Sequence, residues 1–301
     1  MKNILITGGS GMIGKKITEQ LLRDDYSVAW LSRSADHGGQ KTFIWDVKKK
    51  TIDPEAMKWA DGIIHLAGAS VADGRWTEER KKVILNSRLE STQLLFDAIR
   101  VEEDKPKVIV SASAVNYYGM DTGDKVLTEE DKPGDAFLSE VVKKWEKEVK
   151  RFESLHIRTV MLRIGIVLSL EGGALPELLK PPVAAPLGTG KQYMSWIHLS
   201  DLARMFRYAL LTEQLHGPYN AAGPKPVTNK ELTEKAAKLK GKPFINIGVP
   251  TFALKLFLGE MADMVVGGNK LSSSKIQSSG FKFRYNNIDD ALGQLFYQYK
   301  D

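Results

Sequence analysis

Cysteine is absent from the 301 residues of this sequence. Disulfide bonds are therefore excluded, and so is every metal or redox site that needs a thiolate. Histidine is scarce as well: the five histidines lie at positions 37, 65, 156, 198 and 216, and none of these spacings is that of a metal-binding motif. We therefore expect no metal site in this protein.

Long hydrophobic runs are also missing. A membrane-spanning helix needs roughly 18 or more consecutive apolar residues, whereas the best candidate stretch, residues 159–170, is shorter and carries Arg163. The chain starts with Met-Lys-Asn and then enters an apolar segment directly, which leaves no room for a signal or transit peptide. We expect a cytoplasmic protein without a membrane partner.

The excess of one sign of charge is small. The 43 Lys and Arg residues and the 37 Asp and Glu residues give a net charge of +6, and the lysines at 48–50, 81–82 and 143–144 form short, scattered groups. A nucleic-acid partner is therefore not expected, although the excess suits a ligand that carries phosphate. Apolar residues at 43% and charged residues at 27% are typical of a globular protein.

The sequence does have an alternation of short apolar segments and helical patterns. The expected strands are residues 3–7, 27–32, 42–46, 62–66, 107–111 and 158–164. Amphipathic helices are expected between them, over residues 12–23, 78–100 and 136–152. This alternation predicts the α/β class, with a doubly wound parallel sheet of the Rossmann type that is covered on both faces.

The regular alternation of strand and helix patterns ends after Gly165. Glycine and proline residues between 172 and 190 indicate loops, and further helices are expected over 199–211, with Ser200 as the cap, over 229–240 and over 251–260. We predict two units: a nucleotide-binding domain over residues 1–225 and a smaller C-terminal substrate lobe over residues 226–301.

A glycine-rich turn joins the first expected strand to the first expected helix. Gly8 permits a tight turn, Gly11 lets the backbone approach a diphosphate, and Gly14 lets the helix pack closely on the strand. The free N–H groups and the positive dipole end of the helix then favour phosphate. We predict a dinucleotide site at Gly8, Gly9, Ser10, Gly11, Met12, Ile13 and Gly14. A glycine-rich turn without a ligand is the alternative.

The end of the second strand predicts which dinucleotide binds. Sites for NAD place Asp or Glu about 20 residues beyond the glycines, where it binds the ribose 2′-hydroxyl. Here the strand ends in Ser32, Arg33 and Ser34, which can bind a 2′-phosphate instead. We therefore predict NADP(H), with a solvated surface arginine as the alternative. Asp46, which ends the third strand, is expected either to bind the adenine amino group or to cap a turn.

These features resemble the short-chain dehydrogenase/reductase superfamily, in its extended, sugar-nucleotide-epimerase-like branch. Further segments match that branch in order: residues 65–68, 86–88, 111–119 and 196–201. The resemblance implies that Leu66, Ala67 and Gly68 line the cofactor, that Asn86 is the structural asparagine, and that Ser113 is the active-site serine. Residues 219–224, 226–229, 259–261 and 280–283 resemble the group called epimerase family proteins, whose C-terminal domain has no established function.

The sequence departs from the superfamily at its catalytic pair, Tyr-x-x-x-Lys. None of the nine tyrosines is followed four residues later by lysine. Counting along the expected helix places Leu138 and Val142 in the two positions, and a register one residue later places Ser139 and Lys143 there. In the superfamily the tyrosine transfers the proton, and a positioned acid typically contributes about 10²–10⁴-fold. Another group must supply the proton if hydride transfer occurs.

Three residues are candidates to replace the missing acid. Tyr117 and Tyr118 follow Ser113, and Glu140 lies on the helix where the resemblance places the catalytic pair. The alternatives are aromatic packing for the tyrosines and a solvated position for Glu140. Arg88 is expected to contact a substrate anion or to form a salt bridge.

Two hypotheses of function follow. The first is an NADP(H)-dependent oxidoreductase or epimerase-like enzyme that acts on a small, nucleotide-linked molecule near Ser113, in a pocket shaped by residues 69–77 and 172–190. The second is a non-catalytic NADPH-binding protein that senses redox state or serves as an interaction module. The resemblance also implies a homodimer formed through the two long helices, residues 78–100 and 136–152.

Overall fold

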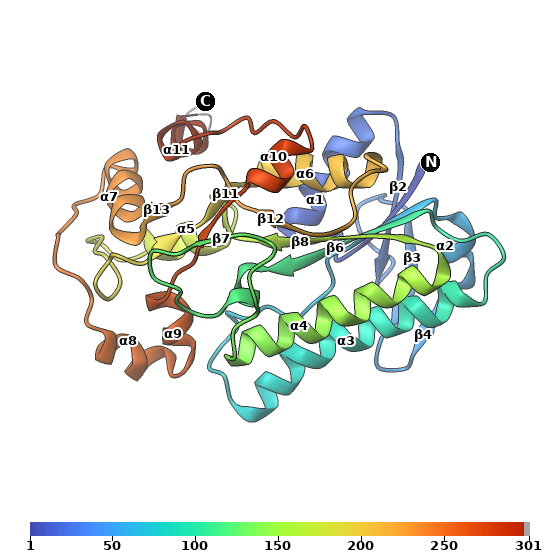
Figure 1. Cartoon of the computed structure of the whole chain (residues 1–301), viewed down its shortest axis with the longest axis horizontal. Coiled ribbons are helices and arrows are strands. Elements are labelled where there is room, and N and C mark those ends of the chain that lie inside the picture. The colour runs from blue at the N-terminus through green and yellow to red at the C-terminus, as the bar shows by residue number, and fades with distance from the viewer. Residues whose placement is uncertain (298–301) are drawn as a thin grey trace.

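The computed structural model, which describes residues 1–297, has a central sheet with helices on both faces (Figure 1). In spatial order its strands are β12 (Gly217–Ala221), β8 (Arg158–Ile164), β6 (Val108–Ala114), β5 (Gly62–His65), β1 (Asn3–Thr7), β2 (Ser27–Ser32), β3 (Thr42–Asp46) and β4 (Thr51–Ile52). All neighbouring strands run parallel except the antiparallel edge pair β3 and β4. The predicted α/β class with a parallel sheet is therefore confirmed.

Alternate residues of each central strand face opposite layers of helices. Ile4 and Ile6 of β1 pack with α1 (Met12–Arg23) and α6 (Leu199–Leu211). Leu5 between them packs on the other face with α2 (Pro54–Trp59) and α3 (Glu78–Arg100), and α4 (Phe137–Lys150) lies beside α3 (Figure 1). Because both faces are covered, the strands are continuous apolar runs, which is why the sequence pattern identified them.

The order of the strands creates a crevice beside β1. The chain moves from β1 to β2 and β3 on one side, and then from β5 to β6, β8 and β12 on the other. The loops after β1 and β5 therefore separate at the carboxyl ends of the strands. Ligands of open α/β sheets bind at this switch point.

The remaining elements are short or follow β12 in the chain. They are β7 (Val126–Leu127), β9 (Ile166–Leu168), β10 (Tyr193–Met194), β11 (Trp196–His198), β13 (Val227–Thr228), β14 (Lys270–Leu271), the 3₁₀-helices η1 (Val115–Tyr118) and η2 (Arg151–Leu155), α5 (Ala174–Leu178), α7 (Asn229–Lys240), α8 (Thr251–Leu258), α9 (Met261–Val266), α10 (Ser274–Ser278) and α11 (Ile288–Tyr297). No helix within residues 1–297 has the length and apolar character that crossing a membrane requires.

The cap predicted for α6 is wrong. The N-cap is His198 rather than Ser200: the His198 Nδ1 atom accepts a hydrogen bond from the Ser200 N–H at 3.1 Å. The His198 ring also lies 4.1 Å from the Tyr285 ring, centroid to centroid, and is 4% exposed. A histidine ring nitrogen accepts the orphan amide of a helix as a serine hydroxyl would, so the sequence preference for serine pointed to the wrong residue.

The segment predicted as a C-terminal lobe shares its core with residues from earlier in the chain. One apolar cluster joins Leu168 and Trp196 to Leu232 of α7 and Leu292 of α11. In the opposite direction, Ile276, Phe281 and Phe283 pack in the core beneath α6. The predicted boundary at 225/226 remains a prediction, and the last four residues of the predicted lobe lie outside the described range.

Asp201 of α6 joins the two regions. Its side chain is 1% exposed, and its Oδ1 and Oδ2 atoms accept from the backbone N–H groups of Arg284 (3.0 Å to each) and Tyr285 (2.9 Å). Oδ1 also accepts from Arg204 at 2.7 Å. Three donors thus converge on one buried carboxylate, which anchors the segment that leads into α11.

We expect Asp201→Ala to lower the free energy of unfolding by about 3 kcal/mol, because it leaves two backbone N–H groups of residues 284 and 285 without an acceptor, and each such loss costs about 1–3 kcal/mol. Asp289→Ala is the control: its side chain is 67% exposed and pairs with Lys235, so a change below about 1 kcal/mol is expected. Urea titration measures both. Equal losses for the two variants would contradict the anchoring role.

Candidate functional site

The loop after β1 has the backbone geometry of a phosphate site. Gly8 has a φ of +69°, which side chains rarely adopt, and the Gly11 N–H donates to the Gly8 carbonyl at 3.1 Å. A Cβ at Gly14 would lie 2.6 Å from the Gly8 carbonyl oxygen, so only glycine lets α1 approach this closely. The predicted roles of Gly8 and Gly14 thus have direct structural reasons.

The N-terminus of α1 is open. Its N-cap, Gly11, has extended backbone and no side-chain hydrogen bond to the helix, and Ser10 and Gly11 are both exposed. Met12 and Ile13 begin the helix and are half-buried, and the Met12 Sδ atom would lie 3.8 Å from a Cβ at Gly172. The amide groups of this turn are therefore available to an anion. The loop around Gly172 lies close by.

At the end of β2, Ser32 and Ser34 contact His37, a residue that the sequence did not indicate as part of the site. The His37 Nε2 atom lies 2.8 Å from the Ser32 hydroxyl oxygen and 3.4 Å from that of Ser34. Arg33 is exposed and has no hydrogen bond or ion pair with any residue of the described range. The predicted trio therefore forms a polar group with one free guanidinium. The sequence does carry a signal for His37, because it lies only three residues after Ser34.

Asp46 caps a turn. Its Oδ1 atom accepts from the N–H groups of Lys48 at 2.9 Å and Lys49 at 3.1 Å. This geometry agrees with the turn-cap alternative. Contact between Asp46 and adenine remains a prediction. It would use the Asp46 Oδ2 atom, because Oδ1 accepts both of these hydrogen bonds.

A buried chain of hydrogen bonds holds the loop after β5. The Thr7 hydroxyl oxygen accepts from the N–H groups of Leu66 and Ala67, at 3.0 Å each, so its proton is directed to His65 Nδ1 at 2.8 Å. His65 Nε2 must then carry the proton and donate to Thr92 at 3.0 Å. The amides of Leu66 and Ala67 are used internally, so any contact of theirs with a cofactor is through other atoms.

The helix α3 supports the same loop from the other side. The Ser87 hydroxyl accepts from the Ala69 N–H at 2.9 Å, and Arg88 donates to the Ala69 carbonyl at 3.1 Å. Arg88 has no carboxylate partner in residues 1–297, and burial lowers its pKa to about 10. The salt bridge considered for Arg88 is therefore not formed. Gly68 and Asn86 are exposed, and their predicted roles stay predictions.

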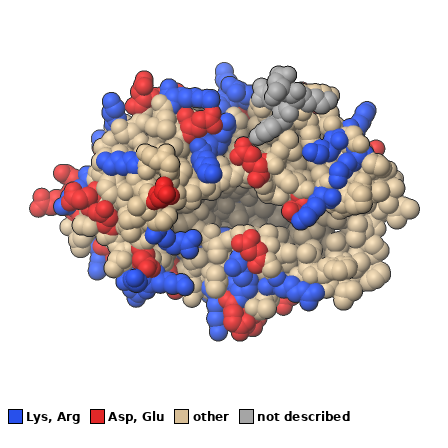
Figure 2. All heavy atoms as spheres, turned by 180° about the vertical axis from the view of Figure 1, so that it is seen from behind, with Lys and Arg blue, Asp and Glu red and all other residues tan. Residues whose placement is uncertain are grey.

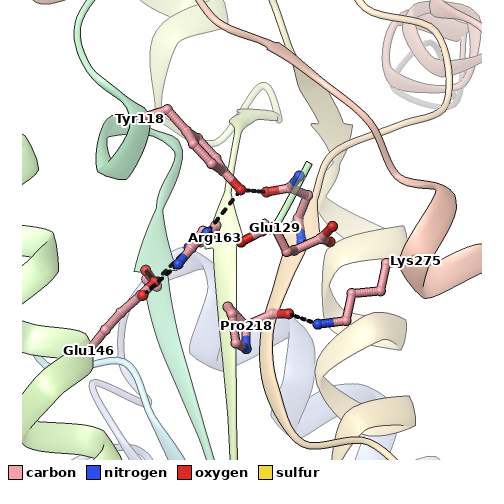
Figure 3. Close-up of polar contacts among 8 residues, drawn as sticks. Tyr118, Glu129, Glu146, Arg163, Pro218 and Lys275 are labelled. Carbon is pink, nitrogen blue, oxygen red and sulfur yellow. Dashed lines mark hydrogen bonds and ion pairs between the residues drawn. The ribbon is translucent and has the colours of Figure 1, made fainter. Parts of the chain in front are cut away.

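Glu146, Arg163 and Tyr118 belong to a buried polar network (Figure 3), and Ser113 lies at its end. Its hydroxyl donates to the Glu146 Oε1 atom at 2.5 Å, and Glu146 receives the Arg163 side chain through Nε at 2.9 Å and Nη2 at 2.8 Å. Arg163 is 2% exposed. Burial alone would lower the pKa of Arg163, but the Glu146 carboxylate raises it above its ordinary value, so the guanidinium stays charged. Sequence reasoning singled out neither Glu146 nor Arg163.

Tyr118 belongs to this network and its hydroxyl is fully occupied. It donates to the Asn220 side-chain oxygen at 2.6 Å and accepts from Arg163 at 3.0 Å. Tyr118 is 4% exposed, and burial raises its pKa to about 12, although Arg163 opposes the shift. A phenol with this pKa releases its proton reluctantly, so the geometry favours a packing role for Tyr118.

Tyr117 differs from Tyr118 in the hydrogen bonding of its hydroxyl. It is half-buried, and its ring centroid lies 3.4 Å from the Arg163 Cζ atom and 5.3 Å from the Tyr118 ring. Within the described residues its hydroxyl has no hydrogen-bond partner. Tyr117 therefore has the Arg163 guanidinium stacked on its ring, and its hydroxyl is available to a ligand.

The helix α4 does not supply the missing catalytic pair in either register. Leu138 and Val142 are 2% and 3% exposed and pack in the core. In the later register, the buried Ser139 hydroxyl donates to the Asn116 carbonyl at 2.8 Å, while Lys143 pairs with Glu140 on the surface. Glu140 is thus a partner in an exposed ion pair, which agrees with its solvated alternative.

A hollow opens in the middle of the molecule when it is viewed from behind (Figure 2). Lys, Arg, Asp and Glu side chains lie around its rim, so both signs of charge border the opening. Ligand sites are mostly apolar clefts in which a few polar or charged groups fix the orientation of the ligand.

Residues 4–144 match the NAD dependent epimerase/dehydratase family, and residues 249–295 match a domain of unknown function, DUF1731. An epimerase family protein of Bacillus subtilis, YfhF, is 38% identical over 97% of each chain. One of Staphylococcus aureus is 36% identical over 98% of this chain and 99% of its own. The crystal structure of a human epimerase family protein, SDR39U1 with NADPH, is 30% identical and has a TM-score of 0.88, over 98% of this chain and 99% of that one.

We expect the neutral His65 to make stability depend on pH. Burial, reinforced by the Arg88 charge, lowers the pKa of His65 from 6.5 to about 3. Because the unfolded chain takes up a proton that the folded chain refuses, the free energy of unfolding should fall as the pH drops from about 6.5 towards 3. The contribution of one such group is about 1.4 kcal/mol per pH unit.

Urea titrations of wild type and His65→Gln between neutral pH and pH 4 measure this slope. In His65→Gln the slope of the free energy of unfolding against pH should be smaller by the contribution of one proton. His216→Gln, which alters an exposed histidine, should keep the wild-type slope. A wild-type slope in His65→Gln would mean that His65 is not the buried neutral group described.

Proposed function

The chain belongs to the epimerase family, and on this premise we propose that it binds NADP(H) and acts as an oxidoreductase-like or epimerase-like protein on a small, nucleotide-linked substrate. The observation that carries the choice of cofactor is the end of β2. Ser32, Arg33 and Ser34 offer a free guanidinium and two hydroxyls, with no carboxylate to bind a ribose 2′-hydroxyl. The human relative solved with NADPH supports the same choice.

In this proposal a dinucleotide would lie along the carboxyl edge of the sheet. The open turn from Gly8 to Gly14 would hold the diphosphate, and Arg33, with Ser32 and Ser34, would hold the 2′-phosphate. NADPH, when bound, supplies a hydride. The chain's own residues must position the substrate and handle its proton.

The protein groups near Ser113 suggest how a proton is handled without Tyr-x-x-x-Lys. Because Ser113 donates its proton to Glu146, its oxygen can only accept from a substrate hydroxyl. Tyr117 is the candidate whose hydroxyl has no partner among the described residues, and the Arg163 guanidinium is stacked on its ring. We assign Tyr117 the transfer of a proton to the reacting substrate oxygen, and Ser113 the positioning of the substrate through one of its hydroxyl groups.

The second candidate function is a non-catalytic NADPH-binding sensor or interaction module. The missing Tyr-x-x-x-Lys pair favours it, since one register places the buried Leu138 and Val142 in the two positions and the other places Ser139 and Lys143 there. Turnover separates the two functions: tight NADPH binding without oxidation by any carbonyl compound or sugar nucleotide supports the sensor.

We expect Arg33→Glu to weaken NADPH binding by about 10–100-fold, since a charge-assisted hydrogen bond contributes about 1.5–3 kcal/mol. Binding of NADH, which lacks the 2′-phosphate, should change little. Isothermal titration calorimetry measures both. Arg100→Glu, which alters a surface arginine paired with Asp97, should bind NADPH as wild type does. Wild-type protein that binds NADH and NADPH equally would refute the assignment.

We expect Tyr117→Phe to lower the turnover number by about 10²–10⁴-fold while NADPH affinity is kept. The measurement is NADPH absorbance at about 340 nm against a panel of carbonyl compounds and sugar nucleotides, which first identifies an active substrate. Tyr118→Phe is the matched comparison: it should reduce stability, because Asn220 and Arg163 lose a partner, with a much smaller effect on turnover. Unchanged turnover in Tyr117→Phe would show that Tyr117 is not the acid.

A further inference from the structure

The helix α8 leaves large apolar side chains in solvent. Phe252 is 77% exposed, Leu256 69% and Phe257 73%, and no residue of α8 is buried. Ile247, in the segment that leads into the helix, is 74% exposed. We call these four residues the α8 patch. Scattered exposed apolar residues are normal, but a group this dense marks an interaction surface.

The patch lies away from the sheet, at the edge of the C-terminal lobe (Figure 1). The charged residue on α8, Lys255, pairs with Asp263 of α9 at 3.1 Å. The surface is therefore apolar and electrically neutral, so two identical copies can meet without opposing like charges.

We propose that two copies of this chain pair through the α8 patch. A two-fold contact places the same residues of both copies together, so it requires a self-complementary surface. A phenylalanine buries about 150–250 Å², so the four side chains offer on the order of 500 Å² per chain. A standard interface buries about 800 Å² per partner. The patch thus supplies most of what a stable dimer needs.

The two long helices are less suited to this contact. On the outward face of α4, Lys143 pairs with Glu140, whereas the exposed Lys144, Lys147 and Lys150 have no ion-pair partner within residues 1–297. A two-fold contact through α4 would bring these charges together. The neighbouring α3 contributes a large exposed hydrophobic in Val83, which is 46% exposed. The observations therefore favour α8 over the pair of helices that the family resemblance implies.

A lipid surface is a weaker match for the patch. Helices that lie on membranes carry several Lys or Arg residues on their polar face. The helix α8 is eight residues long, and its one lysine is already paired.

The proposed contact also reaches the loop of residues 69–77. The Arg75 Nε atom donates to the Phe257 carbonyl at 3.1 Å, and its Nη2 atom donates to the Leu256 carbonyl. The end of α8 therefore holds a loop that follows β5, next to the proposed cofactor site. Pairing through α8 would hold both carbonyls in place and order this loop.

The test is the mass of the full chain at micromolar concentration, measured by light scattering after gel filtration. Wild type should have twice the mass of one chain, and the double variant Phe252→Ser, Phe257→Ser should have the mass of one. Val101→Ser removes an isolated side chain that is 73% exposed, and it should remain a dimer, as should Val83→Glu. Unchanged circular dichroism and melting temperature would show that the double variant is folded.

Three outcomes would overturn the proposal: a monomeric wild type, a double variant that stays dimeric, or loss of the dimer in Val83→Glu alone. A monomeric wild type that sediments with phosphatidylcholine and phosphatidylserine vesicles would assign the patch to a membrane instead. Hydrogen exchange tests the link to the loop: amides 69–77 should exchange faster in the double variant, and equal exchange would contradict it. None of these measurements requires NADPH.

Discussion

The buried pair between Glu146 and Arg163 organises the candidate site. It connects α4 to β8, directs the Ser113 proton, and, through Arg163, fixes Tyr118 and Asn220 of the last sheet strand. Breaking such a pair leaves an uncompensated buried charge, which typically costs about 3–5 kcal/mol. Replacing both residues by apolar groups would remove that cost and also the orientation of Ser113, so the pair is better explained by positioning than by stability.

The same pair gives a physical account of how the chain departs from its superfamily. The superfamily places a charged lysine below a tyrosine on one helix, whereas Leu138 and Val142 pack in the core here. A fixed positive charge is instead supplied from β8, and it stacks on Tyr117 of η1. In the proposed site, charge and phenol would therefore come from different elements than in the superfamily. A search for one linear motif cannot find this arrangement.

Features that depend on local sequence could be predicted, and those that depend on side chains meeting across the fold could not. The strands and the turn from Gly8 to Gly14 are continuous patterns, and the structure forms them where expected. Glu146 and Arg163 lie on different elements, and their contact follows only from the packing of α4 against β8. His37 approaches Ser32 because the chain turns back over residues 33–36, and His198 caps α6 because its ring reaches the Ser200 amide.

The central claim is that the N-terminus of α1 holds a diphosphate while Arg33 holds a 2′-phosphate. Phosphorus-31 NMR of NADPH titrated with the protein observes both groups at once. The account predicts that the diphosphate and 2′-phosphate resonances shift and broaden together, and that both reach their bound positions at one equivalent. Resonances that stay at their free positions at excess protein, or a diphosphate shift with an unperturbed 2′-phosphate, would contradict it.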